Sequence, residues 1–135
     1  MKERRFRREL RSLEAIHEFV TEFLAAHGLP DSHSFDVDLI LEELFTNMVR
    51  HSREGSHDIA IALERDGRDV TIRLRDFDVQ AYDVTDAPAF DIRQPLSQRR
   101  PGGMGLHLVR QIADTIRYQY ADRISTITVT KRLDP

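Results

Sequence analysis

The chain has 135 residues, of which 40% are hydrophobic and 32% charged, and its formal net charge is −3 at pH 7. These values predict one globular domain over residues 1–135, and they argue against general nucleic-acid binding, which needs a basic surface. Because the sequence has no cysteine, disulfides, thiolate metal sites and thiol catalysis are excluded. No apolar run approaches membrane-spanning length and no signal-peptide hydrophobic region opens the chain, which favours a cytoplasmic protein with no membrane contact.

The segment from Lys2 to Arg11 is strongly basic, with six Lys or Arg residues around two apolar ones. Such a cluster could meet an acidic partner or a phosphate backbone, but it is more typical of a solvated edge strand that is charged against pairing with another chain. From Ser12, a possible N-cap, the pattern becomes helical and ends near Gly28. Its apolar stripe consists of Leu13, Ile16, Val20, Phe23 and Leu24.

A second helix is predicted from about Phe35 to Ser52, with the core stripe Val37, Ile40, Leu41, Leu44, Phe45 and Met48. A polar row, formed by Glu43, Asn47 and His51, has the four-residue spacing that stacks side chains on one helix face. Large apolar residues flank Glu43 and Asn47 on both sides, so we do not expect their side chains to be fully exposed to solvent. An Asn oxygen can hold hydrated Mg²⁺ while a Glu takes a proton; the alternative is a surface Glu/Asn hydrogen bond.

Alternating apolar residues predict strands over residues 57–64 and 69–76, joined by a hairpin that contains Asp66-Gly67. Two more strands are predicted over residues 115–121 and 125–132, with a tight turn at Asp122-Arg123. The stretch from Val84 to Arg100 has few periodic features, and connections of that length are usually lids or disordered.

Three glycines, Gly102, Gly103 and Gly105, lead into a helical pattern with Leu106, Val109 and Ile112 on one face. A glycine loop that opens a helix forms an anion cradle, because unpaired N–H groups and the positive end of the helix dipole meet there. Taken alone, the stretch also fits a flexible turn before a core helix. Arg99 and Arg100 precede the glycines, either as phosphate contacts or as solvated loop residues.

The stretch Glu43-Leu44-Phe45-Thr46-Asn47-Met48-Val49-Arg50-His51-Ser52 resembles the N box of the GHKL ATPases, and its Thr and His bring it closest to the anti-sigma-factor serine/threonine kinases. Gly102 to Arg110 resembles the second glycine box of that family. Both motifs stand in the expected order, and the resemblance covers essentially the whole chain. It implies an α/β two-layer sandwich, the Bergerat fold, with a mixed and mainly antiparallel sheet, helices on one face and an ATP lid over about 84–101.

In the first glycine box of this family, an Asp accepts a hydrogen bond from the adenine amino group, and a Gly follows two residues later. Asp76 matches that Asp, whereas Asp78 stands at the glycine position. A side chain and a negative charge near the purine are therefore expected to weaken nucleotide binding without abolishing it.

The resemblance implies that the chain binds ATP and Mg²⁺ and acts as a protein kinase in transcription regulation. Glu43 would be the general base or serine-orienting group, Asn47 the Mg²⁺ ligand, and Arg100 the group that steadies the transferred phosphoryl group. Other expected nucleotide-binding residues are His51, Asp76, Gly102, Gly103, Met104, Gly105 and Leu106. The implied partners are a sigma factor and an anti-anti-sigma (STAS) protein that is phosphorylated on serine, with the kinase itself a homodimer.

Two alternatives remain at this point. The chain could be a degenerate module that keeps the fold and sequesters a regulatory partner without kinase activity, which Asp78 would explain. A histidine-kinase catalytic domain separated from its dimerisation helices is supported less well, because no phosphoacceptor helix hairpin precedes the first helix.

Overall fold

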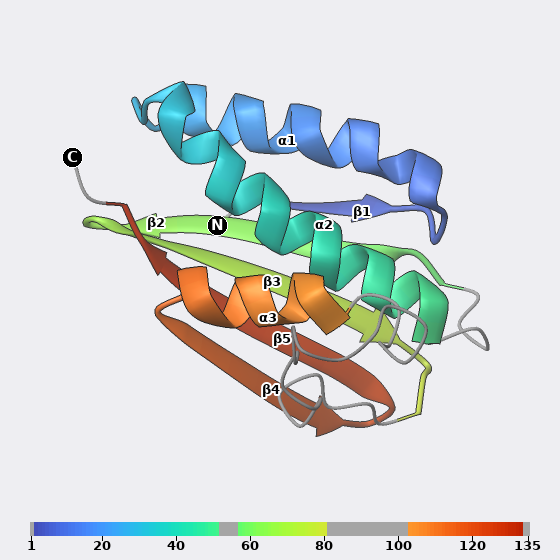
Figure 1. Cartoon of the computed structure of the whole chain (residues 1–135). Coiled ribbons are helices and arrows are strands. Elements are labelled where there is room, and N and C mark those ends of the chain that lie inside the picture. Colours follow the sequence, from blue (N-terminus) through green and yellow to red (C-terminus); the bar gives the residue numbers. More distant parts are fainter. Residues whose placement is uncertain (1, 52–56, 81–102, 134–135) are drawn as a thin grey trace.

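The computed structural model describes residues 2–51, 57–80 and 103–133 (Figure 1). Its elements in chain order are β1 (Lys2–Phe6), η1 (Leu10–Ser12), α1 (Leu13–Ala26), η2 (Asp31–His33), α2 (Ser34–His51), β2 (Ile59–Asp66), β3 (Asp69–Phe77), α3 (Gly103–Ile112), β4 (Thr115–Ala121) and β5 (Ile124–Arg132). The two predicted helices before residue 52 and all five predicted strands are therefore present, with boundaries shifted by a few residues.

The five strands form one sheet in the order β1-β2-β3-β5-β4, and each of its four pairings is antiparallel. The basic N-terminal segment supplies the edge strand β1, as predicted. Both predicted hairpin turns are formed, with Gly67 at φ 62° and the pair Asp122-Arg123 at φ 53° and 62°. Two successive positive φ values give a turn whose twist matches that of the flanking strands.

All three α-helices cover the same face of the sheet, so the molecule has two layers, as expected (Figure 1). On β3, residues alternate between buried and partly exposed, because successive side chains point to opposite faces. The core between the layers joins the stripes of α1 and α2 to the inward face of β2, β3 and β5. It includes Phe19, Phe23, Leu41, Phe45, Ile61, Leu63, Ile72, Leu74, Ile127 and Val129.

The six predicted stripe residues of α2 are all buried, whereas α1 differs from the prediction in two details. Phe19 is fully buried and was missing from the predicted stripe, since its position lies beside Ile16 and Val20 on a wider apolar face. The predicted N-cap role of Ser12 is wrong: its hydroxyl donates to the Arg7 carbonyl, 2.8 Å away, because a 3₁₀ turn already precedes the helix.

The antiparallel layout brings one end of several elements together. The loop after β1, the last turn of α2, the end of β3, the first turn of α3 and the β4–β5 turn all lie at the same end of the sandwich (Figure 1). The β2–β3 hairpin and the C-terminus of β5 lie at the opposite end. We call the first of these the convergent end.

Candidate functional site

Helix α2 carries Glu43 and Asn47 one turn apart, on a face between its buried stripe and solvent. Glu43 is half-buried, and burial is the main cause that raises the pKa of its carboxyl group above the ordinary value. The negative charge of Glu42 raises this pKa further, and the positive charge of Arg50 opposes both effects. A carboxylate with a raised pKa is a better proton acceptor than an ordinary surface Glu.

Asn47 is 9% exposed, and its Nδ2 has no hydrogen-bond partner among the described residues. A buried amide with an unmet donor normally has a reason, such as a ligand or an ordered water. Its carboxamide also offers an oxygen of the kind that Mg²⁺ accepts, and Mg²⁺ at phosphate sites needs only one or two protein ligands. Asn47 therefore fits the expected role as a ligand of nucleotide-bound Mg²⁺.

Asp76 lies near the end of β3 and faces the helices, because it continues the inward alternation of Val70, Ile72 and Leu74. It is 1% exposed, so its carboxylate is almost fully removed from water. Oδ1 forms an ion pair with the guanidinium of Arg8, whereas Oδ2 is buried and accepts no hydrogen bond from any described residue. Oδ1 of the expected adenine-binding group is thus bound within the protein, whereas Oδ2 has no donor among the described residues.

Arg8 comes from the loop between β1 and η1, outside both resembling motifs. Its Nη1 donates to the Met48 carbonyl, 3.2 Å away, and its Nη2 donates to Asp76. Burial lowers the pKa of this guanidinium below its usual value. An Arg side chain nevertheless stays protonated in proteins. Arg8 could not be singled out from the sequence, because nothing in a run of six basic residues shows which one turns inward.

Asp78, at the glycine position of the first box, has the backbone conformation that favours glycine, with φ at 54°. Its side chain is 62% exposed and accepts a hydrogen bond from Arg123 Nε, 2.8 Å away on the β4–β5 turn. This hydrogen bond, followed by the charge of Arg123, lowers the pKa of Asp78. The next residue is also anchored to that hairpin, since Val79 N–H donates to the Arg123 carbonyl and the Val79 carbonyl accepts from the Tyr120 hydroxyl.

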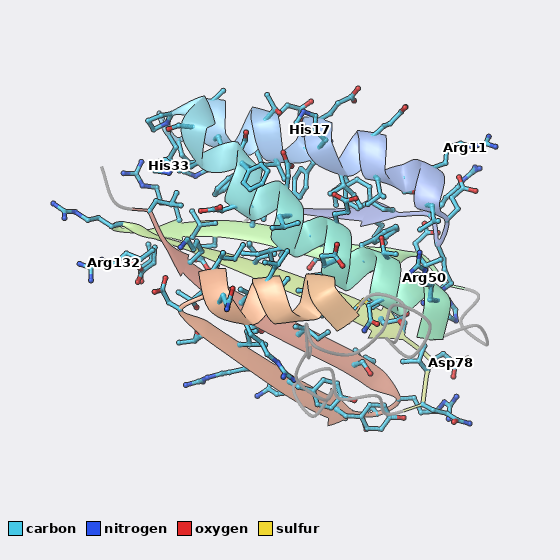
Figure 2. All side chains as sticks on the ribbon, viewed as in Figure 1. Arg11, His17, His33, Arg50, Asp78 and Arg132 are labelled. Carbon is cyan, nitrogen blue, oxygen red and sulfur yellow. The ribbon has the colours of Figure 1, made fainter. Side chains whose placement is uncertain are left out.

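Figure 2 shows Arg50 and Asp78 at the convergent end, whereas His33 and Arg132 lie at the opposite end. His17 lies on α1 away from both ends and is hydrogen-bonded to Asp38 at 2.8 Å. Of the predicted site residues, Glu43 and Asn47 lie one turn apart on α2, and Arg8 links Asp76 to the carbonyl of Met48 in the last turn of that helix.

Helix α3 begins at Gly103, so Gly103, Met104 and Gly105 belong to its first turn. The helix therefore begins earlier than predicted, and the predicted glycine loop is wrong at these positions. The N-terminus of α3 lies beside the last turns of α2 (Figure 1), and so its positive dipole end belongs to the convergent end. Leu106 follows in the same helix.

Other predicted positions lie outside the described residues. These are Gly102, Arg100 and the whole of the lid predicted over 84–101, together with the side chains of His51 and of residues 103–107. Over the described ranges, no group of three or more His, Cys, Asp or Glu side chains is placed to hold a metal ion. No helix in the described part of the chain is long and apolar enough to cross a membrane.

Comparison with known proteins matches residues 6–131 to the histidine kinase-like ATPase domain family. The chain is 31% identical over 103 residues to the serine/threonine-protein kinase BtrW of Bordetella bronchiseptica, covering 75% of this chain and 72% of that protein. Among solved structures, it is similar to the SiaB-SiaC complex from Pseudomonas aeruginosa (TM-score 0.61, 15% identity, 97% of this chain and 88% of that chain). It is also similar to the Acinetobacter baumannii histidine kinase AdeS (TM-score 0.54, 15% identity, 100% of this chain and 69% of that chain).

Proposed function

Since the chain belongs to the histidine kinase-like ATPase domain family, we propose that it is an ATP-dependent protein serine/threonine kinase of the anti-sigma type. It binds a sigma factor in one state and phosphorylates a serine of an anti-anti-sigma (STAS) protein in another, as a cytoplasmic homodimer that regulates transcription. Its similarity to a protein named as a serine/threonine kinase supports the kinase activity.

The observation that carries this proposal is a pair of buried polar atoms at the convergent end whose hydrogen bonds are unmet among the described residues. Asp76 Oδ2 is an acceptor and Asn47 Nδ2 a donor, and each is buried at a cost unless a partner binds. The amino group of adenine supplies a donor for Asp76. Asn47 would hold the Mg²⁺, and the N-terminus of α3, where backbone N–H groups favour anions, would hold the phosphates.

In the proposed reaction, the serine Oγ attacks the γ-phosphorus of ATP, the bond from that phosphorus to the β,γ-bridging oxygen breaks, and ADP leaves. Glu43 accepts the serine proton, for which its raised pKa is suited. Bound Mg²⁺ supplies charge neutralisation at the phosphates. Arg100 is proposed to steady the transferred phosphoryl group, and His51, Gly102, Gly103, Met104, Gly105 and Leu106 to bind the nucleotide.

A second candidate function is a module that sequesters its partner without phosphorylating it. Asp78 at a glycine position is the observation that favours this candidate. Two observations on Asp78 oppose the sequestering module. Asp78 keeps the positive φ expected of a glycine at this position, and its carboxylate is hydrogen-bonded to Arg123 on the neighbouring β4–β5 hairpin. We therefore rank the kinase first.

Equilibrium binding of ATP and ADP in Mg²⁺ buffer, measured by calorimetry, tests the nucleotide site. We expect micromolar affinity, on the order of −8 kcal/mol, which weakens in Asn47→Ala. Wild-type protein that binds neither nucleotide would contradict the kinase and favour the sequestering module.

Transfer of γ-labelled phosphate to purified STAS-domain proteins tests the chemistry. Glu43→Gln should abolish labelling and keep ATP affinity within about threefold, because Gln preserves the shape of the side chain but accepts no proton. Glu42→Gln, one residue away and exposed, is the matched control and should label normally. Retained turnover in Glu43→Gln would remove Glu43 from the proton-transfer role.

A further inference from the structure

Arg8 connects the two polar groups that the proposed nucleotide site depends on. Its guanidinium donates from Nη2 to Asp76 on β3, and from Nη1 to the carbonyl of Met48, the residue that follows Asn47 on α2. Its side chain is 10% exposed, and that of Asp76 is 1% exposed. The ion pair is thus removed from water. In the protein interior electrostatic interactions are stronger than in water, and losing one partner of a buried pair is strongly destabilising.

The Met48 carbonyl lies in the last turn of α2, where carbonyls have no partner within the helix. A cation at that point satisfies the carbonyl and complements the negative end of the helix dipole. Arg8 therefore fixes the end of α2 that carries Asn47 relative to the strand that carries Asp76. A loop outside both sequence motifs sets the geometry between them.

The pairing also decides what the free oxygen of Asp76 can bind. A buried carboxyl group without a counter-charge tends to take up a proton and then donates a hydrogen bond as well as accepting one. A carboxylate that holds a guanidinium stays ionised and only accepts. With Oδ1 occupied by Arg8, the buried Oδ2 requires a donor from the ligand.

We propose that Arg8 is a positioning residue that sets the purine specificity of this site, by keeping Asp76 an acceptor-only carboxylate that selects a 6-amino over a 6-oxo purine. A 6-amino purine presents an N–H donor to Oδ2. A 6-oxo purine presents an acceptor at the same place, and two facing acceptors repel. This inference rests on the proposed nucleotide binding and adds to it the residue that enforces the choice of base.

The test compares the affinities of ADP and IDP, which differ at position 6 of the base and share the same phosphates and ribose. Calorimetry in Mg²⁺ buffer is carried out on the wild type and on Arg8→Met, Arg8→Gln and Arg8→Lys. We expect the wild type to bind ADP about 10- to 100-fold more tightly than IDP, the range for a hydrogen bond to a charged group. In Arg8→Met and Arg8→Gln this ratio should fall to about threefold or less, whereas Arg8→Lys should retain most of it.

Arg4→Met is the matched control, because Arg4 belongs to the same basic segment but bonds to the exposed Glu22 at 3.2 Å. It should leave the ADP/IDP ratio unchanged. Thermal melting without nucleotide is recorded for every variant, so that lost stability is separated from lost selectivity. If Arg8→Met does not fold, Arg8→Gln, which keeps a donor without the charge, decides the matter.

Two outcomes would overturn the inference while leaving the nucleotide site intact. An unchanged ADP/IDP ratio with a lowered melting temperature would make Arg8 a purely structural residue. Tighter ADP binding in Arg8→Met would mean that the guanidinium competes with the base for Asp76. Failure of the wild type to bind either nucleotide is the separate result that removes the proposed function, and this inference with it.

Discussion

Two aspartates at the end of β3, two residues apart, each pair with an arginine from a distant part of the chain. Asp76 and Arg8 form a buried pair, whereas Asp78 and Arg123 form an exposed one. The alternation of a strand does not separate them, since both have the same parity. The chain leaves the strand between them, at Phe77, and the positive φ of Asp78 turns its side chain outward.

The comparison shows that the contribution of an ion pair to stability depends on how far the pair is buried from water. Removing one partner of a buried pair leaves a charge that neither water nor protein compensates, whereas an exposed partner is replaced by water. The buried pair with Arg8 holds Asp76, near the proposed ligand, whereas the exposed pair with Arg123 holds Asp78, in the turn after β3. Four predictions test this difference, ordered by the size of the expected effect.

The largest effect is expected from breaking the buried pair in the nucleotide-free protein. Arg8→Met should lower the free energy of unfolding by about 3 kcal/mol, the lower end of the range for an uncompensated buried charge. Arg123→Met, the matched variant of the exposed pair, should change the urea midpoint only slightly. Equal losses in the two variants would contradict the distinction, and urea denaturation of both proteins measures it.

The next effect concerns the backbone of Asp78. Because its φ is 54°, a conformation that residues with a Cβ adopt at a cost and Asp tolerates better than most, Asp78→Ala should lower the melting temperature by roughly 2–5 °C. Asp78→Gly should melt at or above the wild-type temperature, since Gly accepts this φ without strain. Its ATP affinity should rise by no more than about threefold, because the Asp78 side chain is exposed and bonded to Arg123. A large gain in ATP affinity on restoring glycine would instead show that Asp78 degrades the site.

Glu43 extends the comparison to a half-buried carboxylate whose pKa is raised, chiefly by burial. Its ionised form costs stability above the raised folded-state pKa, and this cost disappears as the pH falls below the ordinary value of 4.5. Glu43→Gln should therefore unfold at slightly higher urea concentration than the wild type at pH 7, with no difference near pH 4. A less stable variant at pH 7 would mean that the carboxylate has a favourable partner.

The smallest effect belongs to the titration of Asp78, whose pKa is lowered by its hydrogen bond to Arg123. A lowered acid pKa contributes stability above the unfolded-state value, ordinarily 3.8, and loses it as the pH falls through the folded-state value. In urea titrations the wild type should be slightly more stable than Asp78→Asn at pH 6, and the difference should shrink below pH 3.8 and disappear as the pH falls through the lowered folded-state pKa. A difference that grows on acidification would have the wrong sign for this pair.

Local patterns in the sequence were sufficient for most of the fold. An apolar repeat of about 3.6 residues predicted α1 and α2, and a repeat of about two residues predicted the strands. Apolar residues at these spacings lie on one face of a helix or of a strand, where they can be buried together. The turns at Gly67 and Asp122-Arg123 followed from residues that tolerate positive φ. The family resemblance added the sandwich arrangement, which the structure confirms, and the roles of Glu43, Asn47 and Asp76, which stay predictions.

Only the tertiary structure decided which groups meet. Arg8 and Asp76 are 68 residues apart, and their contact exists because the β1 loop and the end of β3 converge at the same end of the sandwich. Six basic residues near the N-terminus look alike in sequence, yet the path of the chain after β1 buries this one. Likewise, the bond between Asp78 and Arg123 depends on how the end of β3 packs beside the β4–β5 turn, which no local pattern encodes.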